Sequence, residues 1–169
     1  MIANQDRLVL SPYLLTSLIN VGRHECLNNT VEQPGAPLFQ SKSDIHKRYG
    51  NLLALRIVLK RALDFFVEQT NSGGLVHKCW FYLNESEAVD PERQWPDDFL
   101  HKHPNDTVVF YIHNEDNKGT FVLREQDDEL VEVGGLVNTM TFFKSGVVHT
   151  PPVIESGYRL TLVVDIIPK

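Results

Sequence analysis

Residues 134–167, GGLVNTMTFFKSGVVHTPPVIESGYRLTLVVDII, contain two apolar runs separated by turn-forming residues. β-branched and aromatic residues dominate both runs, and serine–glycine and proline pairs supply the turns, so we expect two strands. His149 lies between the runs, and Arg159 stands at the start of the second run. The pattern therefore predicts a histidine and an arginine on neighbouring strands.

These two residue types suit the binding of a small oxo-acid. An imidazole is a common ligand for iron or zinc. A guanidinium offers a fixed fork of donors that matches a carboxylate. A metal ion and a cationic side chain that binds a carboxylate are the two groups needed to hold such an acid.

The composition favours a single soluble domain, residues 1–169. A chain of 169 residues with 42% apolar content can bury a hydrophobic core, and its net charge of −6 argues against a nucleic-acid partner. Cys26 and Cys79 have neither zinc-site nor disulfide spacing, which favours reduced thiols in the cytoplasm. The N-terminus lacks signal-peptide features and no apolar run reaches the ~18 residues of a membrane span, so we expect no membrane partner.

Residues 1–74 are expected to be helical and residues 75–169 to form strands. Ser11-Pro12 predicts a helix start with an end near Asn20–Gly22, and a second helix is predicted from Asp44 to Thr70. The six strand-like runs that follow are Leu75–Leu83, Thr107–His113, Thr120–Arg124, Glu129–Val133, Leu136–Phe143 and Tyr158–Ile167. This order favours a mainly β (α+β) fold of the jelly-roll kind, with the N-terminal helices packed on one sheet.

A second group of histidines precedes the strand at residues 107–113. His101 and His103 alternate, so in an extended segment both imidazoles point to the same face and can chelate one metal ion. Asp106 follows as a further candidate ligand, as a partner of a ligand, or as a turn former after Pro104. Isolated histidine pairs of this spacing are common, so the signal gains weight only together with His149.

At these residues the chain resembles the 2-oxoglutarate- and iron(II)-dependent oxygenases, whose core is a double-stranded β-helix. The matching residues in the C-terminal part are Gly135-Leu136-Val137, Phe142-Phe143, His149, Pro152-Val153 and Gly157-Tyr158-Arg159-Leu160-Thr161-Leu162. The segment HKHPNDTVVFYIHN, residues 101–114, is similar to that of a small prolyl-hydroxylase-like branch with an HxHPN motif, common in phage and marine bacteria. The resemblance implies a cupin-like jelly roll over residues 75–167.

The resemblance implies that His101 and His149 ligate iron. His103 stands where most of the family has an aspartate, which leaves three neutral imidazoles and shifts the site toward that of a cupin. Asp106 is the alternative third ligand, although its spacing is less favourable on a strand. The bound metal, and the choice between His103 and Asp106, stay open at this point.

The same resemblance implies a role for residues near the metal. Arg159 would pair with the distal carboxylate of the cosubstrate 2-oxoglutarate, and Thr161 and Tyr111 would add hydroxyl hydrogen bonds. No catalytic residue is implied beyond the metal ligands. The implied reaction is hydroxylation of a substrate coupled to decarboxylation of 2-oxoglutarate to succinate, in which the cofactors supply the difficult chemistry.

The substrate is not determined by the sequence. A small molecule or a peptide is implied, and the polar loop Glu85–Leu100 and Trp95 are candidates for its recognition. Tyr82 and Asn84 alternate on one predicted strand and are weaker candidates for lining the pocket. Two other functions remain open: a cupin-type dioxygenase or isomerase that uses no 2-oxoglutarate, and a non-catalytic jelly-roll binding module. A homodimer is a general expectation for such a protein.

Overall fold

The computed structural model describes residues 1–5, 7–31, 38–86 and 94–169, and its strands form two antiparallel sheets. The larger sheet has the order β1 (Ile2–Gln5), β8 (Met140–Phe143), β5 (Asp106–Asn114), β10 (Tyr158–Pro168), β4 (Gly74–Glu85), β3 (Leu38–Ser41) and β2 (Thr30–Val31). The smaller sheet has the order β7 (Glu129–Val133), β6 (Thr120–Arg124) and β9 (His149–Thr150). The mainly antiparallel β fold expected from the sequence is confirmed.

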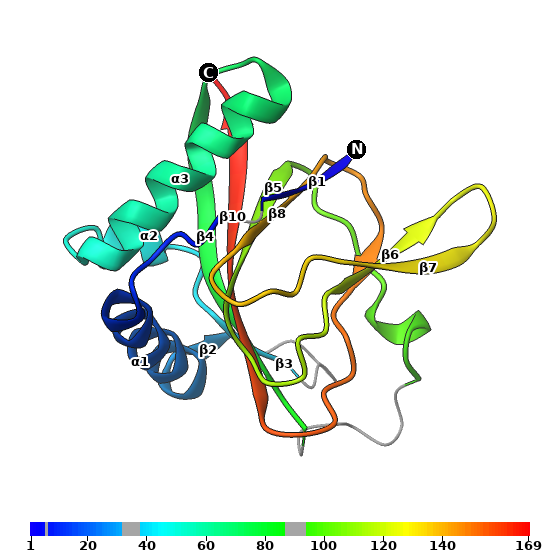
Figure 1. Ribbon diagram of the computed structural model, residues 1–169, viewed down its shortest axis with the longest axis horizontal. Coiled ribbons are helices and arrows are strands. Elements are labelled where there is room, and N and C mark those ends of the chain that lie inside the picture. The colour runs from blue at the N-terminus through cyan, green and yellow to red at the C-terminus, as the bar shows by residue number, and fades with distance from the viewer. Residues whose placement is uncertain (6, 32–37, 87–93) are drawn as a thin grey trace.

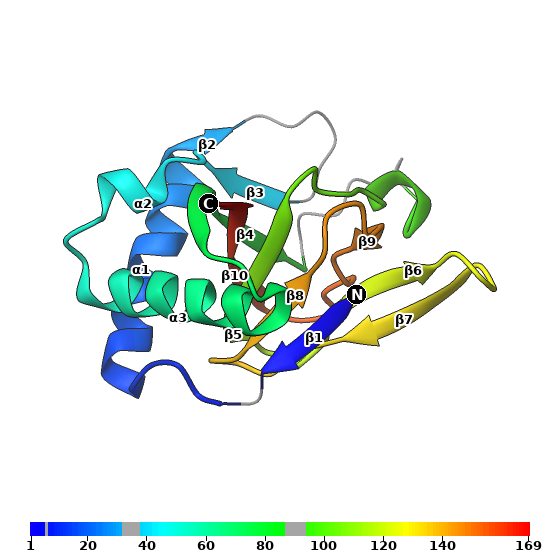
Figure 2. The ribbon, with the colours of Figure 1, turned by 90° about the horizontal axis from the view of Figure 1, so that it is seen from above.

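Helices α1 (Pro12–Asn28), α2 (Ile45–Arg48) and α3 (Leu53–Thr70) cover one face of the larger sheet (Figure 1). The smaller sheet lies on the other side, as the view from above shows (Figure 2). The predicted packing of the N-terminal helices on one sheet is therefore confirmed. Among the described residues, no helix combines the length and apolar character needed to cross a membrane.

Strand β10 lies in the middle of the larger sheet and separates two hydrophobic clusters. Because side chains alternate along a strand, Leu160 and Leu162 point into the cluster under the helices, while Val163 belongs to the cluster between the sheets. The cluster under the helices is the larger of the two. The space between the sheets is left to a smaller cluster and to polar side chains.

The first helix runs further than predicted. Ser11 caps it, since its Oγ accepts a hydrogen bond from the Leu14 N–H at 3.4 Å, and Pro12 occupies the first turn as expected. The predicted end near Asn20–Gly22 is wrong, because α1 continues to Asn28. A Cβ on Gly22 would lie 2.9 Å from both Leu160 and Phe81, so this glycine lets the helix approach the sheet closely.

The long helix predicted over Asp44–Thr70 is also wrong, because the chain breaks it into α2 and α3. Arg48 and Tyr49, at the end of α2, turn toward the buried carboxylate of Glu25, which accepts hydrogen bonds from the guanidinium (2.7 Å) and from the Tyr49 hydroxyl. Gly50 follows, and glycine has a low helix propensity. Helix α3 ends at Thr70, where the end of the predicted second helix was expected, and Asn71 follows in a left-handed conformation.

The predicted strands at 75–83, 107–113, 120–124, 129–133 and 158–167 are present with small changes in their ends. The strand predicted over Leu136–Phe143 is four residues long, β8, because the chain forms a turn before Met140. Asn138 has a positive φ of 68° there, and its side chain hydrogen-bonds the backbone of Leu10. Strands β1, β2, β3 and β9 were not predicted. They are two to four residues long, too short for a periodic pattern.

Candidate metal centre

His101 and His149 are held side by side by their own backbones. Each residue's N–H donates to the other's carbonyl oxygen at 2.9 Å, so His101 forms an isolated antiparallel bridge with β9 at the edge of the smaller sheet. Residues directly opposite each other in an antiparallel pair carry their side chains on the same face. The two imidazole rings accordingly lie with centroids 4.4 Å apart.

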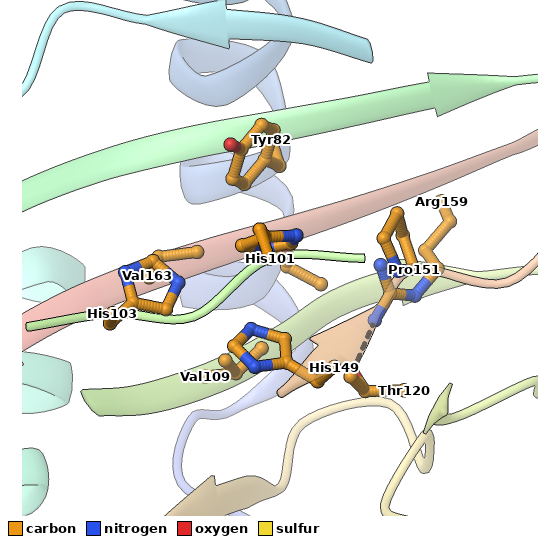
Figure 3. Close-up of a pocket in the computed structure, with 10 residues that line it drawn as sticks. Tyr82, His101, His103, Val109, Thr120, His149, Pro151, Arg159 and Val163 are labelled. Atoms are coloured by element: carbon orange, nitrogen blue, oxygen red, sulfur yellow. Dashed lines mark hydrogen bonds between the residues drawn. The ribbon is translucent and has the colours of Figure 1, made fainter. Parts of the chain in front are cut away.

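His103 brings a third imidazole to the same place. Its ring centroid lies 5.4 Å from that of His101 and 5.2 Å from that of His149. One nitrogen from each of the three rings lies within 4.8 Å of the others, and Figure 3 shows the rings converging on one space. A group of this size and composition can hold one metal ion, since imidazole suits iron, zinc, copper and nickel.

The backbone also fixes which nitrogen faces this space in two of the rings. The Nδ1 of His101 lies 2.9 Å from the carbonyl oxygen of Phe99, and the Nδ1 of His149 lies 2.9 Å from that of Val147. A carbonyl oxygen only accepts, so each Nδ1 carries the proton and donates it. In a neutral ring the Nε2 lone pair is then free to bind a metal.

The three histidines are held in the neutral form. Burial lowers the pKa of His101 below its usual value. Burial, followed by repulsion from the neighbouring histidines, lowers the pKa of His103 to about 3. Burial, followed by repulsion from His101, lowers the pKa of His149 to about 4. Metal ligation requires neutral imidazole, so no proton has to be removed from these rings at neutral pH.

Arg159 lies in the same pocket, at the end away from His103 (Figure 3). The side chain is buried, its Nη2 donates to Thr120 Oγ1 at 3.1 Å, and its guanidinium lies 5.3 Å from the centre of the Tyr111 ring. Its Nε has no hydrogen-bond partner, and no carboxylate within the described residues pairs with it. Burial lowers the pKa of Arg159, but arginine stays charged in proteins. A buried cation without a counter-ion is costly, and an anionic ligand would offset that cost.

The empty space at this pocket amounts to about 410 Å³, a value that includes open solvent. Its lining residues are Tyr82, His101, His103, Val109, Thr120, His149, Pro151, Arg159, Thr161 and Val163. Thr120 lies against Arg159, whereas Val109 and Val163 lie toward the histidines (Figure 3). The pocket can therefore take a small molecule with an anionic end.

One predicted relation between these residues is wrong. His149 and Arg159 do not lie on neighbouring strands, because β9 belongs to the smaller sheet and β10 to the centre of the larger one. Residues 151–157, which contain two prolines and a glycine with positive φ, carry the chain from one sheet to the other. The two side chains face the pocket from opposite sheets.

The other predicted cosubstrate residues have different surroundings. Thr161 lines the pocket two residues after Arg159, on the same face of β10. Tyr111 is fully buried beneath Arg159, and its hydroxyl lies 3.2 Å from Thr120 Oγ1 and 3.4 Å from the carbonyl oxygen of Val133. Tyr111 thus supports the arginine from behind, while Thr120, which the sequence did not single out, is the residue that contacts it in the pocket.

Asp106, the alternative ligand, lies outside the group of three histidines. It begins β5, and its Oδ1 accepts a hydrogen bond from the Ser145 N–H at 2.8 Å. The carboxylate thus fixes the turn before β9. The structure brings His103 to the other two histidines instead.

The weaker pocket candidates fall in three places. Tyr82 lines the pocket, and Asn84 is buried opposite Arg159 in the pairing of β4 with β10. Trp95 is 38% exposed, and its indole N–H donates to the carbonyl oxygen of Pro151, one of the pocket-lining residues. Part of the loop Glu85–Leu100 lies outside the described residues; its later part contains the short 3₁₀ helix η1 (Asp97–Phe99).

No family model and no curated protein sequence matches the chain. Solved structures do match it. The epimerase SnoN from nogalamycin biosynthesis, an α-ketoglutarate-dependent non-haem protein, is 14% identical with a TM-score of 0.74, over 99% of this chain and 77% of SnoN. HygX from Streptomyces hygroscopicus, solved with nickel and 2-oxoglutarate, is 12% identical with a TM-score of 0.70, over 99% and 83% of the two chains.

A Pseudomonas putida prolyl-4-hydroxylase is 16% identical, with a TM-score of 0.61 over 99% of this chain and 92% of the hydroxylase. At these identities the likeness shows a shared fold. The fold expected from the resemblance to 2-oxoglutarate- and iron(II)-dependent oxygenases is therefore confirmed, and His101 and His103 of the HxH motif belong to one cluster with His149.

Proposed function

We propose that this protein is an oxygenase that depends on iron(II) and 2-oxoglutarate. One observation carries the proposal: three neutral imidazoles share one pocket with a buried arginine that has no counter-ion among the described residues. The histidines are suited to a metal and the arginine to a carboxylate. A molecule that is both a metal chelator and a carboxylate at its far end would satisfy both.

The residues present fit iron(II). His101, His103 and His149 would hold it, because their nitrogens converge, they are neutral, and two of them have Nδ1 occupied by a carbonyl oxygen. Bound iron(II) would supply the redox chemistry that couples decarboxylation of 2-oxoglutarate to oxidation of a substrate.

The residues around Arg159 would bind and orient the cosubstrate. The guanidinium would pair with its distal carboxylate, and the nearby hydroxyls of Thr120 and Thr161 are available as further donors. Val109 and Val163 would pack against the carbon chain and keep water from the pocket. Tyr111 would hold the arginine in place through its ring.

Hydroxylation of a small molecule or a peptide is the proposed outcome. Among the proteins of this fold, the P. putida prolyl-4-hydroxylase and a viral collagen prolyl hydroxylase are named for peptidyl proline, whereas SnoN is named as an epimerase. The two hydroxylase names support hydroxylation, the epimerase name does not, and all three leave the substrate to experiment.

A second candidate function is that of a cupin-type metalloenzyme that uses no 2-oxoglutarate. The observation that favours it is His103, which supplies a neutral ligand where a carboxylate is usual in the oxygenases. This alternative gives no role to the buried charge of Arg159. The two functions therefore differ in what Arg159 does.

The test is an anaerobic titration of the iron(II)-loaded protein with 2-oxoglutarate, followed by the visible charge-transfer band of a chelated oxo-acid. We expect the band in the wild type and a loss of 2-oxoglutarate affinity of about 30-fold or more in Arg159→Ala, because a buried charge partner is worth 2–5 kcal/mol. Arg124→Ala, which removes an exposed arginine of β6, is the matched control.

Iron binding should be equal in the wild type, Arg159→Ala and Arg124→Ala. Bound iron without a band in the wild type would support the cupin-type function instead. Unchanged 2-oxoglutarate affinity in Arg159→Ala would refute the role given to this arginine.

A further inference from the structure

The Nδ1 of His103 faces a carboxylate, whereas the Nδ1 of each of the other two histidines faces a backbone carbonyl. Asp165 Oδ1 lies 3.4 Å from His103 Nδ1, and both side chains are largely buried. The same oxygen accepts a hydrogen bond from Thr107 Oγ1 at 2.8 Å. Asp165 is therefore held in place by the neighbouring strand and is directed at the third histidine.

The position of Asp165 follows from the alternation of β10. Arg159, Thr161, Val163 and Asp165 are two residues apart in turn, and the first three line the pocket. β10 thus presents a cation at one end of the site and a carboxylate at the other. The histidines lie between these two charges.

The ring of His103 is also held by its neighbours. Trp80, from β4, contacts it with ring centroids 5.5 Å apart, and the ring of His149 stacks on it at 5.2 Å. With Asp165 at Nδ1, the remaining nitrogen, Nε2, is directed away from the carboxylate. All three histidines then have an oxygen facing Nδ1, at 2.9 Å in His101 and His149 and at 3.4 Å in His103, and Nε2 free for the metal.

We propose that Asp165 is a positioning residue, which orients His103 through Nδ1 and places a negative charge behind a metal site whose own ligands are all neutral. The inference rests on the metal site of the proposed function but not on its use of 2-oxoglutarate. A carboxylate behind a histidine raises the basicity of that ligand, and loss of such a partner commonly weakens metal binding 10- to 100-fold. In most of the family a ligating aspartate supplies a negative charge to the metal site. Here that charge would come from Asp165, which contacts the ligand His103 and not the metal.

The test is a double-mutant cycle on metal affinity, measured by anaerobic competition of iron(II) between the protein and a chelator. We expect Asp165→Asn to weaken iron binding about 10-fold or more in the wild-type background. In a His103→Asp background the same change should have no more than a threefold effect, because no imidazole remains for Asp165 to orient and an asparagine can donate to the new carboxylate.

Asp127→Asn is the matched control, because it makes the same change to an exposed aspartate between β6 and β7. We expect its iron affinity to stay within threefold of the wild type. Equal losses from Asp165→Asn in both backgrounds would overturn the proposal, because the aspartate would then act only through the fold.

A second measurement needs no variant. Long-range ¹H–¹⁵N spectra of the zinc-loaded wild-type protein report which ring nitrogen binds the metal. We expect His103 to carry its proton on Nδ1 and to ligate through Nε2; ligation through Nδ1 would overturn the proposal. A wild-type protein that binds metal normally but shows no 2-oxoglutarate band would refute the proposed oxygenase and leave the role of Asp165 to these two experiments.

Discussion

The two faces of β10 are equally buried but chemically opposite. The face under the helices is wholly apolar and fully buried, with Leu160, Leu162, Val164 and Ile166. The face toward the smaller sheet is 2–4% exposed and carries Arg159, Thr161, Val163 and Asp165. Burying apolar groups stabilises a fold, whereas burying a charge without a partner costs free energy. We infer that the first face maintains the structure and that the second is kept for binding.

This division gives predictions with separate readouts. Changes under the helices should alter the free energy of unfolding and leave metal affinity unchanged. Changes to the metal ligands should lower metal affinity and, at neutral pH, leave the free energy of unfolding nearly unchanged.

The largest expected effect is that of His149→Ala on metal binding. Removing one of three ligands should weaken iron(II) affinity by more than about 100-fold, since loss of a mere outer partner already costs 10- to 100-fold. His24→Ala, on the exposed surface of α1, is the control and should bind iron as the wild type does. Stoichiometric iron in His149→Ala, measured after anaerobic loading and gel filtration, would show that His149 is not a ligand.

Leu162→Ala should lower the free energy of unfolding and leave iron affinity unchanged, the opposite of His149→Ala. The side chain is fully buried among the residues under the helices, so its truncation should lower the free energy of unfolding by about 3 kcal/mol. Iron affinity should remain within threefold of the wild type, because the side chain points away from the pocket. Urea unfolding of the metal-free protein measures the first quantity, and a large drop in iron affinity of the folded variant would contradict the separation of the two faces.

The smallest expected effect is on the pH dependence of stability in the metal-free protein. The pKa values of His103 and His149, about 3 and 4, lie below the ordinary value of 6.5, so the unfolded state binds more protons between these values. Stability should therefore be complete above pH 6.5 and fall as the pH falls. The expected loss is roughly 1 kcal/mol per histidine between pH 6.5 and about pH 5.5.

His103→Gln should remove about half of this loss, because one of the two strongly shifted groups is gone. Thermal unfolding at several pH values in the presence of a chelator measures this loss of stability in the wild type and the variant. Carboxylates with ordinary pKa values are still ionised over this range, so they contribute little. A wild-type stability that does not change between these pH values would mean that the histidines are not buried as neutral groups.

The parts of the fold that follow a local rule could be read from the sequence. The serine–proline start of α1, the Asn71 end of α3 and five of the longer strands are set by capping, turn residues and alternation, which act within a few neighbouring residues. Local rules do not predict the end of α1 correctly, because glycine has a low helix propensity and Gly22 therefore reads as a stop. Only the approach of Leu160 and Phe81 explains why a glycine lies inside this helix.

The sequence predicts part of the candidate site, as it predicts part of the fold. The spacing of His101 and His103 and the isolated His149 predicted a group of histidines, and these three side chains do converge. Val163 carried a usable signal, since it alternates with Thr161. Thr120 and Asp165 carried none, because their roles depend on contacts with Arg159 and His103, which are distant along the chain.

The sequence by itself determined which segments form strands, which residue types could bind a metal and a carboxylate, and the jelly-roll class of the fold. These follow from alternation, from turn residues and from side-chain chemistry, which are properties of short segments. Only the tertiary structure decided that His149 and Arg159 face each other from opposite sheets and that His103 rather than Asp106 joins the other histidines. It also left Arg159 without a counter-ion among the described residues and placed Asp165 behind His103, because pairing between distant strands sets which side chains meet.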